Sequence, residues 1–172
     1  MSGLINRSWL ATILMAIYIL GLVLLTSFAV GVGAEAGLLI WGAPLLVWIP
    51  ILGLHFLQPN PRRAGWCLFT LWLGSTYATT GTSSEILVFA LITALGVAGY
   101  YRSTWLFALA WFGHLLWDFA PRELPQLLQD LPIACMIFDG MIGIYLCWMT
   151  WSGNLRAPLA QGYQPSPKVE PR

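Results

Sequence analysis

The sequence predicts an all-α integral membrane bundle of six transmembrane helices, with both termini in the cytoplasm. Three observations lead to this prediction. Only 9% of the 172 residues are charged and 58% are hydrophobic, whereas soluble domains carry about 25% charged residues. The apolar runs approach the length of about 20 residues that a membrane helix requires. The basic residues gather in alternate connections between these runs, which is typical of multi-pass proteins.

Polar and proline-containing breaks divide the chain into a transmembrane domain over residues 1–151 and a disordered cytoplasmic tail over residues 152–172. The tail is rich in proline, glycine and glutamine, a composition that does not build a packed core. The first apolar run is longer than the core of a signal peptide, about 7–15 residues, so we expect it to be retained. The expected helices cover residues 8–32, 38–57, 64–80, 85–101, 104–120 and 132–151.

Local signals determine the shape and the ends of these helices. Pro44 and Pro50 each remove a backbone hydrogen bond from the second helix, so we expect that helix to bend. Residues 58–63 contain two prolines and two arginines and are expected to form a polar loop. Ser84 is expected to cap the fourth helix, with Glu85 favourably placed in its first turn.

The basic residues orient the bundle. Six spans place both termini and the connections after the second and fourth helices on one side. That side carries seven of the eight Lys and Arg residues, and the other side carries only Arg122. Because Lys and Arg accumulate on the cytoplasmic face, we expect a multi-pass protein of the bacterial inner membrane. The seven residues are Arg7, Arg62, Arg63, Arg102, Arg156, Lys168 and Arg172.

Three ionisable side chains, those of His114, Asp118 and Asp139, lie in the last two apolar runs. An ionisable group at the centre of a membrane helix costs about 2.5–3.5 kcal/mol on insertion scales, so it usually serves a purpose. The i, i+4 spacing puts His114 and Asp118 on one helix face. A rise of about 1.5 Å per residue places Asp139 close to the depth of His114. Because a short connection makes the two helices antiparallel neighbours, we expect the three side chains to meet in the outer half of the bundle.

Such a group is suited to acid–base chemistry. Two carboxyl groups in a medium of low dielectric constant do not easily ionise together, so one of them should keep a proton that it can donate. His114 could accept or relay that proton. We therefore expect Asp139 or Asp118 to act as the acid, and His114 as the base or relay.

Four further residues are expected to line this pocket. Trp111 and Trp117 would form its walls, where their rings could pack on a flat apolar ligand or stabilise a cationic intermediate. The alternative is that these tryptophans face lipid or fill the core. Cys135 and Gly143 share the helix face of Asp139, and the small Gly143 would let a neighbouring helix or a ligand come close.

Two other interpretations of the same group stay open. An intramembrane His–Asp pair can simply tie two helices together, although such contacts average only about 0.6 kcal/mol. His114, Asp118 and Asp139 could also ligate a cation, but H-x-x-x-D is a weak motif and only one histidine is near. His55 is expected near the cytoplasmic boundary, which makes it a poor partner. We therefore assign no metal and no cofactor from the sequence.

The second half of the chain carries a recognisable pattern. His114-x-x-Trp117-Asp118 is followed by a polar loop, by Pro132-x-x-Cys135-x-x-Phe138-Asp139, and by a helix with Tyr145-Leu146. This pattern resembles the C-terminal half of a family of small uncharacterised bacterial polytopic membrane proteins. Members of that family often carry further histidines after the Trp-Asp pair. This chain has Phe119-Ala120-Pro121-Arg122 there, which argues against a metal. The resemblance implies only that His114, Trp117, Asp118, Cys135 and Asp139 belong together.

Three classes of function follow from these observations. The first is a membrane enzyme that isomerises or cyclises an apolar isoprenoid- or lipid-like substrate by acid–base chemistry. The second is a small proton-coupled transporter or permease, which would need a homodimer. The third is a non-catalytic accessory subunit or scaffold of a larger membrane complex. A net charge of +1 without a basic stripe gives no support to a nucleic-acid partner. Membrane lipids, an apolar small molecule and other copies of the chain are the expected partners.

Overall fold

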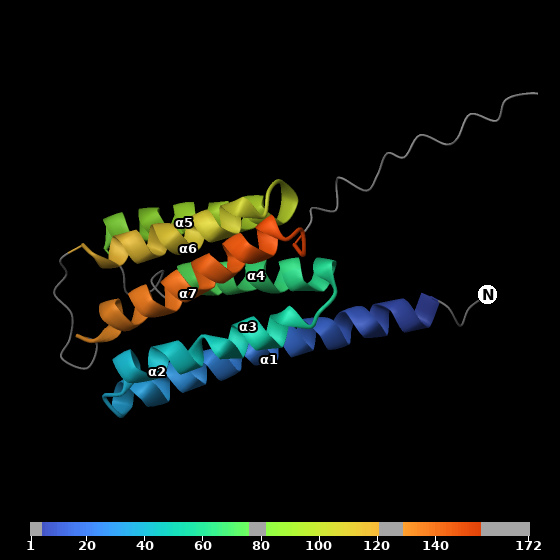
Figure 1. The fold of residues 1–172 in the computed structure, drawn as a ribbon. Helices are drawn as coiled ribbons and strands as arrows, with labels where there is room; N and C mark the ends of the chain where they lie inside the picture. The colour runs from blue at the N-terminus through green and yellow to red at the C-terminus, as the bar shows by residue number, and fades with distance from the viewer. Residues whose placement is uncertain (1–4, 76–81, 121–128, 156–172) are drawn as a thin grey trace, which may run out of the picture.

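The computed structural model of the chain describes residues 5–75, 82–120 and 129–155. Within these residues the regular structure is entirely α-helical, which confirms the predicted all-α class. The helices lie side by side along a common long axis (Figure 1). They are α1 (Ile5–Glu35), α2 (Leu39–Leu46), α3 (Trp48–His55), α4 (Pro59–Ser75), α5 (Ser83–Tyr101), α6 (Trp105–Asp118) and α7 (Leu131–Trp151).

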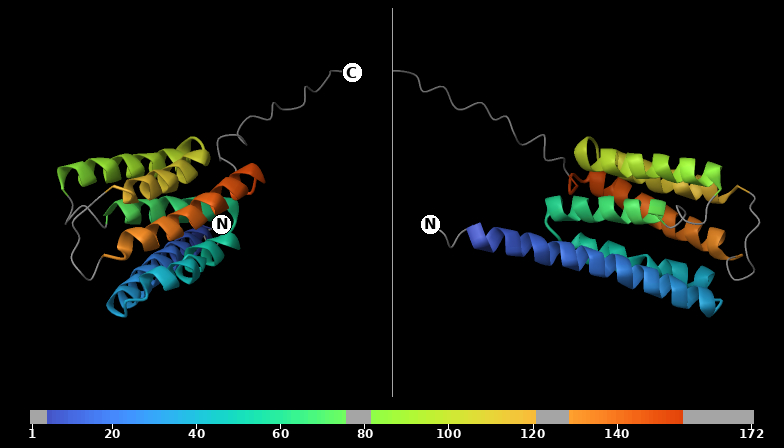
Figure 2. Two further views of the ribbon diagram at one scale, coloured as in Figure 1. Left: turned by 60° about the vertical axis from the view of Figure 1, so that its left-hand side comes forward. Right: turned by 180° about the vertical axis from the view of Figure 1, so that it is seen from behind.

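The chain runs up and down the bundle. The start of α1, the α3–α4 connection, the α5–α6 connection and the end of α7 all lie at one end of it (Figures 1 and 2). Arg62, Arg63 and Arg102 belong to these segments, so we call this end the basic end. The α1–α2 turn, the start of α5 and the end of α6 lie at the opposite end. The alternation agrees with the predicted order of connections.

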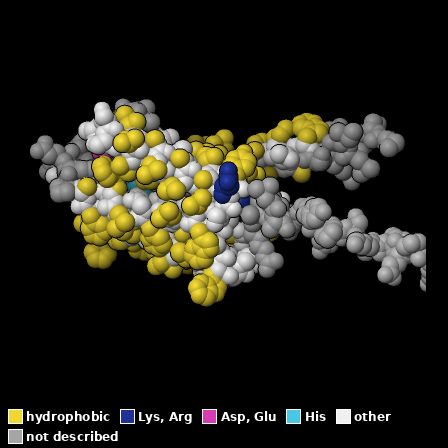
Figure 3. All heavy atoms as spheres, turned by 90° about the horizontal axis from the view of Figure 1, so that it is seen from above, with side chains coloured by type: hydrophobic (Ala, Val, Ile, Leu, Met, Phe, Trp, Pro, Cys, Tyr) yellow, Lys and Arg dark blue, Asp and Glu magenta, His cyan; other side chains and the backbone are white. Residues whose placement is uncertain are grey.

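Apolar side chains cover much of the outside of the bundle. Figure 3 shows hydrophobic side chains over most of one face, with Lys and Arg toward the basic end. Trp41, Phe56 and Trp151 are 81%, 82% and 85% exposed, and so much exposed apolar surface suits hydrocarbon rather than water. Within the described residues, three helices are long and apolar enough to cross a membrane, namely Trp9–Glu35 of α1, α5 and α7. The chain is therefore a membrane protein.

The second predicted helix is interrupted at Val47, where α2 ends and α3 begins. Pro50 has no backbone N–H to donate to the carbonyl of Leu46, so one rung of the helix is missing. Val47 itself keeps helical dihedral angles (φ −60°, ψ −25°). Its N–H still donates to the carbonyl of Ala43 at 3.2 Å. The prolines therefore interrupt the helix as predicted without reversing its direction, and α2 and α3 together form a bent rod.

The third predicted helix begins at Pro59 rather than at residue 64, so the polar loop expected over residues 58–63 is wrong. Pro59 and Pro61 fall in the first turn of α4, where a missing N–H costs no helical hydrogen bond. Arg62 then points back to the end of α3, where it donates to the carbonyls of Leu54 at 3.1 Å and Leu57 at 2.5 Å. The polar residues of this segment thus start one helix and cap the one before it. Residues 76–80, the expected end of the helix, lie outside the described residues.

The cap of α5 is Thr82, not Ser84 as expected. The Thr82 hydroxyl accepts from the backbone N–H of Glu85 at 3.4 Å, and the Glu85 carboxylate accepts from the backbone N–H of Thr82 at 2.6 Å. This reciprocal pair is a capping box, which satisfies two N–H groups that the helix cannot satisfy itself. The sequence rule placed the cap two residues too late, because several consecutive Thr and Ser residues could each have filled the position.

The helices α6 and α7 form the most extensive contact of the bundle, and α7 also packs on α2. Gly143 of α7 makes the approach of α6 possible, because a Cβ there would lie only 2.7 Å from ring atoms of Phe112. After α7 the chain continues as a turn through Gly153 (φ +73°) to the buried Leu155. The rest of the predicted tail, residues 156–172, lies outside the described residues. The buried core of the bundle includes Trp66, Phe69, Phe107, Trp111, Ile142 and Leu146.

Candidate functional site

The three ionisable side chains that the sequence singled out do converge. His114 is fully buried, and Asp139 and Asp118 are 1% and 5% exposed. The Nδ1 atom of His114 shares a hydrogen bond with Oδ2 of Asp139. Oδ2 of Asp118 lies 3.7 Å from the same nitrogen. The structure therefore forms one buried group from α6 and α7, which we call the His/Asp group.

Helix periodicity explains why these side chains face one another. Phe107, Trp111, His114 and Asp118 follow one another at intervals of four, three and four residues, and all four are buried. This spacing keeps them on one face of α6. On α7, Asp139 belongs to a buried face that continues through Ile142 and Leu146. Because these two faces pack together, the polar groups lie at the same level of the interface between α6 and α7.

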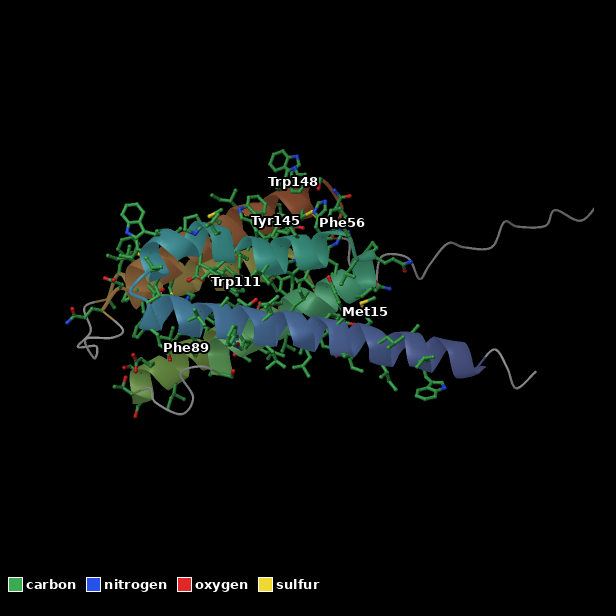
Figure 4. All side chains as sticks on the ribbon, turned by 90° about the horizontal axis from the view of Figure 1, so that it is seen from below. Met15, Phe56, Phe89, Trp111, Tyr145 and Trp148 are labelled. Carbon is green, nitrogen blue, oxygen red and sulfur yellow. The ribbon has the colours of Figure 1, made fainter. Side chains whose placement is uncertain are left out.

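Aromatic rings enclose the His/Asp group. The ring of Phe89, from α5, lies 5.0 Å from the imidazole of His114 between centroids. Trp111 packs on Phe138, the residue before Asp139, at 6.2 Å. Figure 4 shows Phe89 and Trp111 on different helices of the bundle interior. The group is thus bounded by apolar surface from three helices, so its charges interact in a medium of low dielectric constant.

The arginines of the basic end are far from this group. Nη2 of Arg63 donates to the carbonyls of Gly99 and Tyr100 near the end of α5, and its guanidinium lies 5.4 Å from the ring of Tyr100. Phe89, which contacts His114, lies about 15 Å earlier along α5 at the usual rise per residue. Arg63 therefore does not neutralise the two carboxyl groups of the site.

The four residues expected to line the site have different positions. Trp111 is fully buried one turn before His114 and packs edge-on against Trp66 at 6.5 Å. Trp117 is half-buried against the main core. Cys135 is a half-buried free thiol one turn before Asp139. The space over Gly143 is filled by the ring of Phe112, so the partner that this glycine admits is the neighbouring helix.

His55 belongs to a separate cluster at the basic end, as expected from its position in the sequence. Its Nδ1 atom lies 3.0 Å from the hydroxyl of Tyr145. Its ring stacks on Trp148 with centroids 6.1 Å apart, and it meets the ring of Phe56 edge-on. Figure 4 shows Tyr145, Trp148 and Phe56 together at this end, away from Phe89. The pairing of His55 with Tyr145 is a contact that the sequence did not reveal.

The His/Asp group could hold a metal ion. His114, Asp118 and Asp139 each offer one ligand atom, and within the described residues these atoms lie within 4.8 Å of one another. One imidazole nitrogen and two carboxylate oxygens form a donor set that first-row divalent cations accept. The same three atoms can instead share protons, which is the chemistry that the sequence suggested.

Phe89 is a residue of the site that sequence reasoning missed. It stands in an apolar helix between apolar neighbours, so nothing in its local pattern separates a ring that faces the site from a ring that faces lipid. Trp66 was missed for a similar reason. It lies near the start of its helix, where a membrane-interface tryptophan is common, yet it is fully buried beside Trp111.

A comparison of the chain with known protein families, with curated proteins and with solved structures gives no match. The functional argument therefore rests on the geometry of this chain.

Proposed function

We propose that this protein is a membrane enzyme that performs acid–base chemistry, an isomerisation or cyclisation, on an apolar isoprenoid- or lipid-like substrate. One observation carries the proposal. An imidazole and two carboxyl groups share a buried position between membrane helices, with the His114–Asp139 hydrogen bond at its centre and Asp118 3.7 Å away. Groups that both donate and accept protons are expensive in such surroundings, and they are common at functional sites.

The geometry suggests a role for each group. Asp139 holds Nδ1 of His114, which fixes the orientation of the imidazole and directs proton exchange to its other nitrogen, Nε2. This is the arrangement by which a buried carboxylate positions a histidine base. Asp118 is the second carboxyl group, placed to donate the proton that the reaction needs. A proton added at one carbon and removed from another moves a double bond, so no redox partner is required.

The surroundings favour an apolar substrate. Phe89, Trp111 and Phe138 present aromatic rings beside the acid–base groups. The faces of aromatic rings stabilise cations, and protonation of a carbon–carbon double bond creates a cation. Substrates with such bonds and long apolar chains reach the site from the membrane itself.

We also propose that the chain makes six spans in the bacterial inner membrane, with both termini in the cytoplasm. Two features support this arrangement. Successive helices alternate in direction (Figure 1), and Arg62, Arg63 and Arg102 lie at the end where the chain starts and where α7 finishes. The accumulation of basic residues at that end favours its placement on the cytoplasmic side. The His/Asp group then lies in the outer half of the membrane.

A substrate-independent assay tests the enzymatic proposal. The purified protein is incubated in D₂O with a membrane lipid extract and with polyprenyl lipids, and deuterium on carbon is measured by mass spectrometry. An acid–base enzyme should incorporate solvent deuterium into one lipid class. Asp139→Asn and His114→Ala should abolish this incorporation, because each removes a proton-exchanging group.

His55→Ala is the matched control, because it removes the other histidine and leaves the His/Asp group intact. Deuterium incorporation that survives in His114→Ala would contradict the proposal. Loss of folding stability in the site variants, without any exchange in the wild type, would favour the scaffold. Proton flux in proteoliposomes that depends on Asp139, again without exchange into lipid, would favour the transporter.

A further inference from the structure

We propose that the His/Asp group also binds a single first-row divalent cation, such as Zn²⁺ or Mn²⁺, through His114, Asp118 and Asp139. The three ligand atoms already converge, because they lie within 4.8 Å of one another. This proposal does not rest on the acid–base activity, which uses the same side chains without a cation. The two proposals can therefore fail independently.

The backbone needs little rearrangement to hold a cation. Nδ1 of His114 and Oδ2 of Asp118 are 3.7 Å apart, and two nitrogen or oxygen ligands of a tetrahedral zinc, each at about 2.0–2.2 Å, are separated by a similar distance. Asp139 hydrogen-bonds the same nitrogen, so its carboxylate would have to draw back slightly to admit the ion. Two ligands come from adjacent turns of α6 and one from α7, so packed helices fix all three.

Charge favours a divalent ion at this position. Asp118 and Asp139 bring two negative charges when both are ionised, and a histidine ligand is neutral. The arginines of the basic end donate to carbonyl groups there, so they do not compensate these charges. An uncompensated charge among apolar side chains is costly, and one divalent cation would leave the site neutral.

The donor set and the position narrow the kind of ion. An imidazole nitrogen disfavours Mg²⁺ and Ca²⁺, which prefer oxygen ligands, whereas Zn²⁺, Mn²⁺ and Fe²⁺ accept imidazole together with carboxylate. Three protein ligands leave positions open for other molecules, which is typical of catalytic rather than structural zinc sites. Asp118 is the last residue of α6, so the group lies near the opposite end of the bundle, from which an ion could enter.

Metal analysis of the tag-free protein tests this proposal. The protein is purified in detergent, treated with EDTA, loaded with Zn²⁺ or Mn²⁺ and desalted, and its metal content is measured by mass spectrometry. We expect one cation per chain in the wild type and in His55→Ala. We expect loss of that cation in His114→Ala and in Asp118→Asn. The same metal content in wild type and His114→Ala, or no retained metal in the wild type, would overturn the proposal.

A second measurement on the wild type avoids variants that do not fold. X-ray absorption at the zinc edge should show oxygen and nitrogen ligands with the signature of a single imidazole. Sulfur ligands or several imidazoles would contradict the assignment, because the site offers neither. Deuterium exchange into lipid by the EDTA-treated protein, with no metal retained after loading, would leave the enzymatic proposal standing and refute this one.

Discussion

His114 and Asp139 are separated by 25 residues in the sequence, and they share a fully buried hydrogen bond between Nδ1 and Oδ2. The bond joins α6 to α7 at the most extensive helix contact of the bundle. It also selects the tautomer and orientation of the imidazole, because the nitrogen that faces a carboxylate donates its proton to it. One contact therefore contributes to the packing of two helices and prepares a histidine for proton exchange.

Removal of this contact should destabilise the protein. His114→Ala leaves the carboxyl groups of Asp118 and Asp139 buried without the imidazole, and a buried polar group that loses its partner costs about 1–3 kcal/mol. Asp139→Asn keeps an acceptor oxygen for Nδ1, so its cost should be smaller. Chemical unfolding in detergent, followed by circular dichroism, measures both effects. Equal stability of the wild type and His114→Ala would show that the group does not hold the helices together.

Gly143 should tolerate a methyl group poorly. A Cβ there would lie 2.7 Å from atoms of the Phe112 ring, and overpacking of this kind typically costs about 1–3 kcal/mol. We expect Gly143→Ala to lower the unfolding temperature, and a second change, Phe112→Leu, to recover part of the loss. Gly113→Ala is the matched control, because no atom lies within 4 Å of a Cβ at that position. It should be neutral or mildly stabilising, since alanine favours a helix over glycine by up to about 1 kcal/mol.

The sequence was most informative where a physical rule acts over one helix. The i, i+4 spacing of His114 and Asp118 and the low charge content both led to structure that is observed. It was less informative where the outcome depends on a partner distant in the chain. Phe89 on His114 and Tyr145 on His55 are contacts between helices, and an apolar pattern does not specify which residue of one helix meets which residue of another.

Helix ends were also placed imperfectly, for a related reason. Pro59 and Pro61 were taken as loop formers, yet proline is equally suited to the first turn of a helix. Arg62 decides the outcome through its hydrogen bonds to carbonyls of α3, and those acceptors are not visible in the local sequence of α4. The same ambiguity led to Ser84 rather than Thr82 as the cap of α5.

The capping box gives a prediction with an internal control. Thr82→Ala removes the hydroxyl that accepts from the N–H of Glu85, and loss of such a cap costs about 0.5–2 kcal/mol. Ser84→Ala removes a hydroxyl that contacts only Thr82 among the contacts described here, so it should cost less. Unfolding of the two variants in parallel compares them directly. A larger loss for Ser84→Ala would restore serine as the functional cap.

The proposed orientation predicts which ends of the bundle are reached from outside the cell. In a variant without Cys67, Cys135 and Cys147, single cysteines can replace exposed residues at either end. Asn60 is exposed at the basic end and Ala36 at the opposite end. A membrane-impermeant thiol reagent on spheroplasts should label the Ala36→Cys variant and spare the Asn60→Cys variant until the membrane is opened. The reverse pattern would invert the topology, and labelling of both would refute the number of spans.

The most direct test of the central claim is to measure the contact between His114 and Asp139 in a lipid bilayer. The chain has two histidines and three aspartates, so selective ¹⁵N-histidine and ¹³C-aspartate labelling gives few signals, and His55→Ala assigns the histidines. Solid-state NMR should show dipolar coupling between Nδ1 of His114 and one carboxyl carbon, and Asp139→Asn, whose unlabelled asparagine replaces that aspartate, should remove this coupling. A spectrum in which His114 couples to no aspartate carboxyl carbon would mean that the His/Asp group does not exist as described.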